Sequence, residues 1–292
     1  MKKHSWIQFA SIGFCLSIAL LFGYSPAASA QQDSDQPPSD NPQCTDENLH
    51  GRYGYIVSGW LVSLPPVALA PIAAVGIVTF DGEGVLNAQD TFNNSGVISR
   101  RGVLPQTGVG TYTVNSNCTG SATVAGDFAG LTFDFMIVPG TGGSEFSLIV
   151  TDSGTVETGA AIGTVANGDA QRIPDEECTL ATVQGTYRLL AHGFAPAPGN
   201  APSASVGIRI VDGAGHLSGH DTVSMNGMIQ PRDVFSTYTV NLNCTGTQSW
   251  IDGRTFDWVI VAGGAQVFFI RTNPGTINSG TFKKQSGRDV ED

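Results

Sequence analysis

The sequence has few charged residues and lacks any motif that identifies a reaction. Of its 292 residues, 13% are charged and five are histidines. It contains no G-x-S-x-G nucleophile elbow, no Walker loop, no H-E-x-x-H zinc motif and no dinucleotide-binding fingerprint. These absences argue against the familiar serine hydrolases, nucleotide-dependent enzymes and zinc proteases. The sequence by itself names no substrate.

Long apolar runs and helix-like segments are also missing after residue 30. No later run approaches the ~18 residues of a transmembrane helix, and no stretch combines a long 3.6-residue apolar period with helix caps. The chain has 37 glycines and many threonines and valines, which favours β-strands joined by tight turns. Its net charge of −11 argues against nucleic acids and anionic membranes as partners, because these are negatively charged too.

Residues 1–30 have the three parts of a secretory signal peptide. Two lysines precede an apolar run at 6–24, and the small residues at 28–30 form a signal-peptidase site. We expect cleavage after Ala30 and a secreted or periplasmic location. A membrane anchor is the alternative, but the run is barely long enough and no charged stop-transfer segment follows it. The polar residues 31–43 are predicted to be a disordered linker.

One phrase occurs twice in the chain. GTYTVNSNCTG (110–120) and STYTVNLNCTG (236–246) are identical at nine of eleven positions. Further segments match in the same order, which indicates a duplicated unit. These pairs include 51–60 with 185–194, 75–86 with 206–217, 132–138 with 255–261, and 144–159 with 265–280.

The duplication predicts two homologous domains, at 44–160 and 178–284. Residues 161–177 are interpreted as the linker between them, and the polar residues 285–292 as a tail. The length of the chain is sufficient for two domains of ordinary size.

Each copy is predicted to be an all-β domain of about eight short strands. The turns FDGEG and VDGAG are typical Asp-Gly hairpins, in which glycine takes a positive φ. Successive strands joined by such turns favour an antiparallel meander, and eight strands can close into a barrel. Two β-sandwiches are the alternative. In the first copy we expect strands at 51–62, 73–80, 84–92, 96–103, 108–115, 118–126, 131–138 and 143–151.

The pattern Cys…G-x-Y…V-G…F-D-G-x-G…G-T-Y-T-V-N-x-N-C-T-G…T-F-D-F…I-V resembles a domain of unknown function in secreted bacterial proteins. It is also similar to the barrels of allene oxide cyclase and dirigent proteins. The resemblance covers nearly all of both copies. Its motifs are turn and strand residues, so it implies a fold and no reaction. The cyclase family's catalytic residues do not map onto this sequence, and no catalytic role is carried over.

Four cysteines lie beyond the signal peptide: Cys44, Cys118, Cys178 and Cys244. An even number in an exported protein predicts disulfides. Pairing within each copy is the simplest arrangement, since an ancestral unit had to be self-sufficient, but four cysteines allow three pairings. In a strict meander the turn after the fifth strand lies at the end opposite to the start of the first. Either the residues before the first strand run along the barrel, or one strand is counted in error.

Metal and cofactor sites are not expected. The cysteines are too far apart in sequence for the usual zinc motifs. The two histidines of an H-x-x-x-H sequence, His216 and His220, lie ~13 Å apart on an extended strand, too far for one ion.

Asp134 and Asp257 are unusual because each is an acid within an apolar strand, TFDFMIV or TFDWVIV. Alternation puts Asp134 on the face opposite Phe133 and Phe135. If the acidic face lines a lumen, these carboxyls are candidate acids, bases or polar anchors. If the aromatic face lines it, they lie outside.

Four tyrosines occur at matching positions of the two copies: Tyr53, Tyr112, Tyr187 and Tyr238. We list them with the two aspartates as ligand-binding candidates. The alternative is core packing, with each hydroxyl tying down a loop.

Three functional hypotheses follow. The first is a non-catalytic binding or structural module that holds a small hydrophobic molecule in a barrel. The second is a cyclase or isomerase that confines a reactive molecule there. The third is a surface adhesion protein that makes contacts through its proline-rich loops at 61–73 and 195–203. The sequence does not indicate an oligomeric state.

Overall fold

The computed structural model describes residues 43–285, except for 65–67, 103–107, 152–155, 158–159 and 196–200. The predicted signal peptide, nearly all of the predicted linker at 31–43 and the tail beyond 285 lie outside the described residues. The described residues belong to one compact unit, Asn41–Asp292. They contain no helix that is long and apolar enough to cross a membrane.

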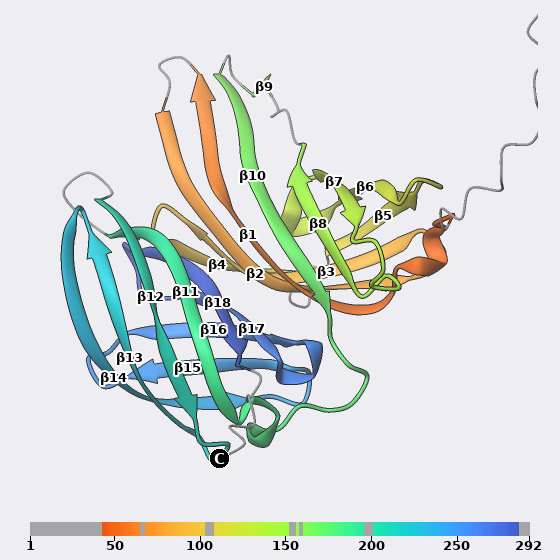
Figure 1. Ribbon diagram of the computed structural model, residues 1–292. Helices are drawn as coiled ribbons and strands as arrows, with labels where there is room; N and C mark the ends of the chain where they lie inside the picture. The colour runs from red at the N-terminus through yellow and green to blue at the C-terminus, as the bar shows by residue number, and fades with distance from the viewer. Residues whose placement is uncertain are drawn as a thin grey trace, which may run out of the picture. The chain divides into compact units, whose positions relative to one another are not determined.

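The protein is all-β and forms two closed antiparallel barrels of eight strands each, as predicted (Figure 1). β-sandwiches are thereby excluded. Short 3₁₀ helices occur between strands: η1 (Asp46–Asn48), η2 (Gly126–Phe128), η3 (Leu180–Val183) and η4 (Ala262–Gly264).

Pairing between its first and last strands closes the first barrel. In order around the ring, its strands are β1 (His50–Leu64), β2 (Ala68–Asp81), β3 (Val85–Asn94), β5 (Gly108–Val114), β6 (Thr119–Val124), β7 (Leu131–Ile137), β8 (Glu145–Val150) and β10 (Ala160–Arg172). Two short strands lie off the ring: β4 (Val97–Arg101), which pairs with β3, and β9 (Val156–Glu157), which pairs with β10.

The second barrel is a continuous meander. Its strands are β11 (Gly185–Ala195), β12 (Ala201–Val211), β13 (His216–Met225), β14 (Met228–Val240), β15 (Thr245–Trp250), β16 (Thr255–Val261), β17 (Gln266–Arg271) and β18 (Ile277–Lys284).

The membership of the first barrel differs from the expected set of strands. The strands expected at 96–103 and 108–115 share one place in the barrel, since their counterpart in the second copy is the single strand β14. The eighth strand is β10, which occupies most of the segment interpreted as a linker, 161–177. That segment pairs with both β1 and β8 because it supplies the hydrogen bonds that would otherwise be missing at two open edges.

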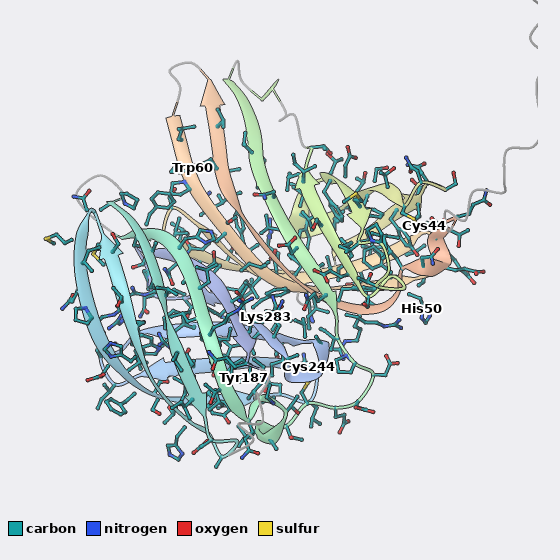
Figure 2. The ribbon with its side chains drawn as sticks, in the orientation of Figure 1. Cys44, His50, Trp60, Tyr187, Cys244 and Lys283 are labelled. Carbon is teal, nitrogen blue, oxygen red and sulfur yellow. A yellow bond between two sulfur atoms is a disulfide. The ribbon has the colours of Figure 1, made fainter. Side chains whose placement is uncertain are left out.

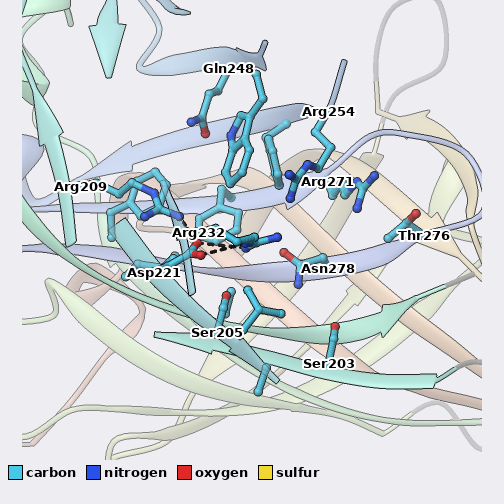
Figure 3. A pocket seen from close by; sticks show the side chains of 18 of the residues that line it. Ser203, Ser205, Arg209, Asp221, Arg232, Gln248, Arg254, Arg271, Thr276 and Asn278 are labelled. Carbon is cyan, nitrogen blue, oxygen red and sulfur yellow. Dashed lines mark hydrogen bonds and ion pairs between the residues drawn. The ribbon is translucent and has the colours of Figure 1, made fainter. Parts of the chain in front are cut away.

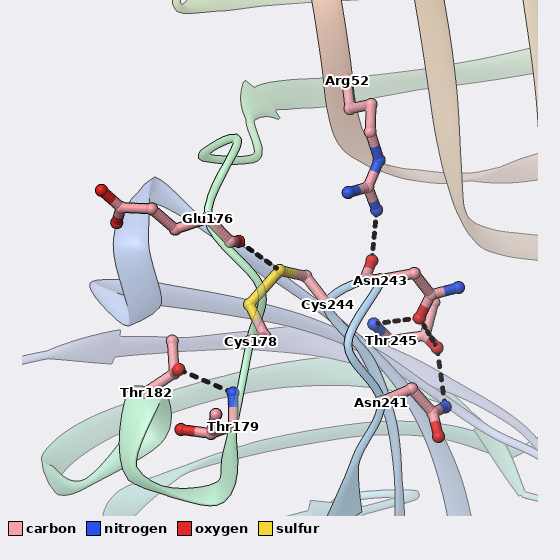
Figure 4. The surroundings of a disulfide bond; sticks show 9 residues. All are labelled: Arg52, Glu176, Cys178, Thr179, Thr182, Asn241, Asn243, Cys244 and Thr245. Atoms are coloured by element: carbon pink, nitrogen blue, oxygen red, sulfur yellow. Dashed lines mark hydrogen bonds between the residues drawn. A yellow bond between two sulfur atoms is a disulfide. The ribbon is translucent and has the colours of Figure 1, made fainter.

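This strand order resolves the difficulty over the cysteines. Cys118 follows β5, the fourth strand of the ring, and an even number of antiparallel strands returns the chain to the end where it began. The disulfides are Cys44–Cys118 and Cys178–Cys244, with Cα–Cα distances of 5.0 and 4.9 Å. Figure 4 shows the second of them. Pairing within each copy is therefore confirmed. Disulfides are compatible with an extracellular or periplasmic location.

The repeated N-C-T-G phrase forms the turn at each disulfide. Asn243 Oδ1 accepts hydrogen bonds from the backbone N–H of Thr245, at 3.2 Å, and from its hydroxyl, at 2.7 Å. Asn117 and Thr119 repeat this geometry at the same distances in the first barrel. These side-chain bonds stabilise the turn and so hold each cysteine opposite its partner.

Aromatic side chains fill one end of the first barrel. The ring centroid of Phe80 lies 5.6 Å from Tyr53, 5.7 Å from Phe146 and 4.8 Å from Tyr112. This aromatic plug is at the Cys44 end of the strands, whereas Trp60 lies toward the other end of β1 (Figure 2). Edge-to-face contacts of this kind stabilise the fold beyond simple area burial.

Candidate functional site

The four tyrosines of the sequence analysis lie in the barrel cores, and their hydroxyls donate hydrogen bonds to backbone carbonyls. Tyr53 bonds to Gly143 O at 2.7 Å, and Tyr187 bonds to Gly264 O at 2.6 Å. A Cβ at Gly264 would lie 2.0 Å from a backbone oxygen, so only glycine brings this carbonyl close enough.

The second tyrosine pair ties down the 3₁₀ helices that follow the first cysteine of each copy. The hydroxyl of Tyr112 donates to Leu49 O at 3.0 Å, and that of Tyr238 donates to Leu180 O at 3.2 Å. Burial raises the pKa of each of the four tyrosines, that of Tyr187 to about 12. These hydroxyls therefore fasten loops to the barrels, and their assignment to ligand binding stays a prediction.

Asp134 and Asp257 lie on the outer faces of their barrels, because the aromatic face of each strand points inward. Phe133 and Phe135 are buried while Asp134 is exposed. Asp257 accepts a hydrogen bond from Thr91 of the first barrel at 2.7 Å and pairs with Arg100 at 2.9 Å. Neither carboxylate lines the lumen cavities described below, and a ligand role for them stays a prediction.

The half of the first barrel beyond the aromatic plug contains a cavity of about 250 Å³. Tyr55, Val57 and Leu61 share one face of β1 and line it over about 20 Å. Most of the remaining lining is aliphatic or aromatic: Ile72, Ala74, Val78, Ala88, Phe92, Val124, Phe128, Leu131, Phe133, Phe146, Leu148 and Val150. A cavity with these walls suits an apolar molecule.

Two polar residues of the cavity wall, Tyr55 and Arg101, form a polar cluster with the buried Asp90. Asp90 is fully buried and pairs with Arg101 through two bonds, Nε–Oδ1 at 2.9 Å and Nη2–Oδ2 at 2.5 Å. The hydroxyl of Tyr55 donates to Asp90 Oδ2 at 2.9 Å. The guanidinium of Arg101 also lies over the rings of Phe92 and Phe128, at 4.1 and 4.5 Å from their centroids. Such a paired, stacked cation is held in a fixed position.

Electrostatics fixes the protonation states of Tyr55 and Arg101 at neutral pH. Burial, and then the negative charge of Asp90, raise the pKa of Tyr55 well above its ordinary value. Burial lowers the pKa of Arg101, but its bonds to Asp90 outweigh this and raise it overall. Tyr55 therefore stays neutral and Arg101 stays charged, which is suited to anchoring a ligand oxygen.

The second barrel repeats the acid–base pair at the matching positions. Asp221 accepts bonds from Arg232 Nε and Nη2, at 2.9 and 3.0 Å, and also from Arg209 Nη2 at 2.5 Å. Burial raises the pKa of Asp221, but the bonds to Arg232 and Arg209 outweigh it and lower the pKa overall. Each barrel thus contains an equivalent Asp–Arg pair, and the residues around the pair differ between the two barrels.

Sequence reasoning did not predict these pairs as a site. Asp90 matches Asp221 and Arg101 matches Arg232 in the repeat. Charged residues kept within strands of both copies were the available signal. Their partnership could not be read from the sequence because the two members of each pair lie on neighbouring strands. Among the described residues, no group of three or more His, Cys, Asp and Glu side chains could hold a metal ion.

Comparison with known proteins gives structural matches at low sequence identity. No family model and no curated protein matches the chain. Solved structures that align with it include kievitone hydratase from Nectria haematococca (8% identity, TM-score 0.30, 87% of this chain and 96% of that one). A putative AttH from Nitrosomonas europaea aligns with 11% identity, TM-score 0.30, and 89% and 99% coverage. A DUF3598-family protein of unknown function from Nostoc punctiforme aligns with 10% identity, TM-score 0.25, and 83% and 100% coverage. At these TM-scores the matches carry no argument about function.

Proposed function

We propose that this protein is an exported, non-catalytic binding protein that holds a small hydrophobic molecule in the lumen of its first barrel. The observation that supports this most is the apolar cavity of about 250 Å³ between the aromatic plug and the far end of β1. Closed eight-stranded barrels are wide enough for one small ligand. The volume lies just below the range of about 300–1,000 Å³ that is typical of ligand pockets, which favours a small molecule.

The polar cluster gives the proposed ligand an orientation. Apolar walls bind by burying surface and have little directional preference, whereas the hydroxyl of Tyr55 and the guanidinium of Arg101 offer fixed polar contacts. A ligand with one hydroxyl or carbonyl group at an otherwise apolar skeleton would match this arrangement.

Export is the second part of the proposal. The predicted signal peptide at 1–30 and the two disulfides both favour an oxidising compartment outside the cytoplasm.

A cyclase or isomerase is the alternative with a specific observation in its favour, an enclosed lumen with a polar cluster. For that function the candidates are Asp134, Asp257 and the four tyrosines Tyr53, Tyr112, Tyr187 and Tyr238. If a turnover is identified, unchanged rates in Asp134→Asn and Asp257→Asn would remove those two from it. Adhesion through the proline-rich segments at 61–73 and 195–203 remains a third hypothesis. Their described residues belong to the ends of strands β1, β2, β11 and β12, and 65–67 and 196–200 lie outside the described residues.

A neutral fluorescent probe tests the binding function directly. N-phenyl-1-naphthylamine becomes emissive in apolar surroundings and carries no charge. Leu148 lines the cavity, and Ile149, the next residue of β8, is exposed on the outer face. We expect the wild type to bind the probe, Leu148→Trp to bind at least tenfold more weakly, and Ile149→Trp to bind like the wild type.

Native mass spectrometry of the exported protein complements the titration by detecting a ligand acquired during expression. Absence of probe binding in the wild type would contradict the proposal. Equal weakening in both tryptophan variants would also contradict it, because the binding would then not depend on the lumen.

A further inference from the structure

The lumen of the second barrel has a different chemical character from that of the first. Its cavity, of about 70 Å³, is lined by four arginines, Arg209, Arg232, Arg254 and Arg271 (Figure 3). The only carboxylate among its lining residues is Asp221. This concentration of positive charge is notable in a chain whose net charge is −11.

Three of these arginines replace apolar residues of the first lumen. In the repeat, Arg209 matches Val78, Arg254 matches Leu131 and Arg271 matches Val150. All three apolar counterparts line the first barrel's cavity. The two cavities are therefore equivalent places in the two copies, and the second has gained three cations while keeping the Asp–Arg pair.

Nearby carboxylates neutralise only part of this charge. Asp221 is shared by Arg209 and Arg232, and Arg254 pairs with Asp252. The Nε of Arg271 donates to the neutral amide oxygen of Asn273 at 3.1 Å. Four arginines therefore face two carboxylates.

The burial and mutual repulsion of these positive charges lower the pKa of two of the arginines. Burial lowers the pKa of Arg209 more than its pairing with Asp221 raises it, and the positive charges of Arg232 and Arg254 add to the lowering. Burial and the charge of Arg254 likewise lower the pKa of Arg271. An anion among these side chains would relieve the repulsion, and a carboxylate is the group that matches guanidinium geometry best.

Two buried donors in the cavity wall also lack an acceptor among the described residues. They are the Nε of Arg209, in a side chain that is almost fully buried, and the indole Nε1 of Trp250. A buried donor without a partner costs about 1–3 kcal/mol, so a ligand oxygen within reach would be stabilising.

The remaining lining is mixed, with aromatic rings, small aliphatic side chains and neutral polar side chains such as Gln248 and Asn278. Phe256 and Phe269 line the cavity, and the guanidinium of Arg254 lies 4.2 Å from the Trp250 ring centroid. Charged donors beside aromatic faces suit a carboxylate with a small apolar body, and the volume of about 70 Å³ limits its size.

We propose that the lumen of the second barrel binds a small organic carboxylate, held by Arg209, Arg254 and Arg271. The two barrels would then bind ligands of different chemistry, one apolar and one anionic. This proposal does not depend on the function proposed for the first barrel, because it concerns a separate cavity.

Isothermal titration calorimetry with acetate and benzoate tests the proposal. Benzyl alcohol serves as the uncharged analogue. Arg271→Val installs the residue found at the matching position of the first barrel. Arg188→Val is the matched control, since Arg188 is exposed on the outer face of β11 and its loss changes the net charge equally.

We expect at least one carboxylate to bind the wild type, binding to weaken with added salt, and benzyl alcohol to bind at least tenfold more weakly. Arg271→Val should lose at least tenfold in carboxylate affinity, and Arg188→Val should be unchanged. If Arg271→Val is unfolded by circular dichroism, Arg254→Leu makes the same test with the first-barrel residue. Failure of both carboxylates to bind the wild type, or equal weakening by Arg188→Val, would overturn the proposal.

The naphthylamine titration keeps the two proposals distinguishable. Arg271→Val should still bind that neutral probe in the first barrel. Loss of probe binding alone would refute only the first site, and loss of carboxylate binding alone would refute only the second.

Discussion

Replacing Asp90 by asparagine tests whether the charged pair in the first lumen stabilises the barrel. The carboxylate is fully buried, and the side chain of Arg101 is 18% exposed. Asparagine keeps an oxygen that can accept the Tyr55 hydroxyl, so the variant removes mainly the charge. Breaking a buried pair by removing one partner costs about 3–5 kcal/mol. Because Arg101 retains some contact with solvent, we expect the lower end, about 3 kcal/mol.

Urea unfolding under non-reducing conditions measures this loss. Asp134→Asn is the matched control, an exposed aspartate in the same barrel for which we expect a change within about 0.5 kcal/mol. The double variant Asp90→Asn/Arg101→Met removes both charges and should recover most of the loss, since the cost arises from the unpaired cation. If Asp90→Asn loses no more stability than Asp134→Asn, the reasoning about the buried pair is wrong.

Three further predictions concern stability. The lowered pKa of Asp221 means that its ion pairs stabilise the fold above its ordinary value of 3.8 and stop doing so as the pH falls through the folded-state value. The difference in unfolding free energy between wild type and Asp221→Asn should therefore narrow below about pH 4, and a constant difference from pH 6 to about 2.5 would contradict this. Replacing Cys44 and Cys118 together by alanine should cost about 4 kcal/mol on the chain-entropy estimate for a sequence separation of 74, measured by urea unfolding, and an unchanged midpoint would exclude a stabilising role. Tyr187→Phe should lose about 1 kcal/mol through its bond to a backbone carbonyl, and an equal or higher stability would show that the bond contributes nothing.

The architecture could be predicted from the sequence because the patterns that indicate it are local or occur twice. Alternation of apolar residues and the Asp-Gly turns depend on neighbours a few residues apart. The carboxylate of Asp81 in FDGEG accepts bonds from the N–H groups of Glu83 and Val85, and Asp212 repeats this in VDGAG. Turn residues of this kind can be recognised in a sequence whose fold is not known.

The boundary of the first barrel was less predictable. The glycine-bearing, weakly patterned segment 161–172 forms a strand because β1 and β8 present open edges on either side of it. That requirement exists only once the other strands are in place.

The candidate site, like the fold, has features that the sequence indicates and features that depend on the tertiary structure. The sequence alone indicated three features. These are the duplicated unit, cysteine pairing within each copy as the simplest choice, and the placement of Asp134 on the strand face opposite its aromatic neighbours. Only the closed barrel decides which face of each strand lines the lumen. It also decides that Asp90 pairs with Arg101 and that Arg209 pairs with Asp221. Strand pairing and barrel curvature set the contacts between residues distant in the chain, and these contacts determine where charge is buried and which cavity it lines.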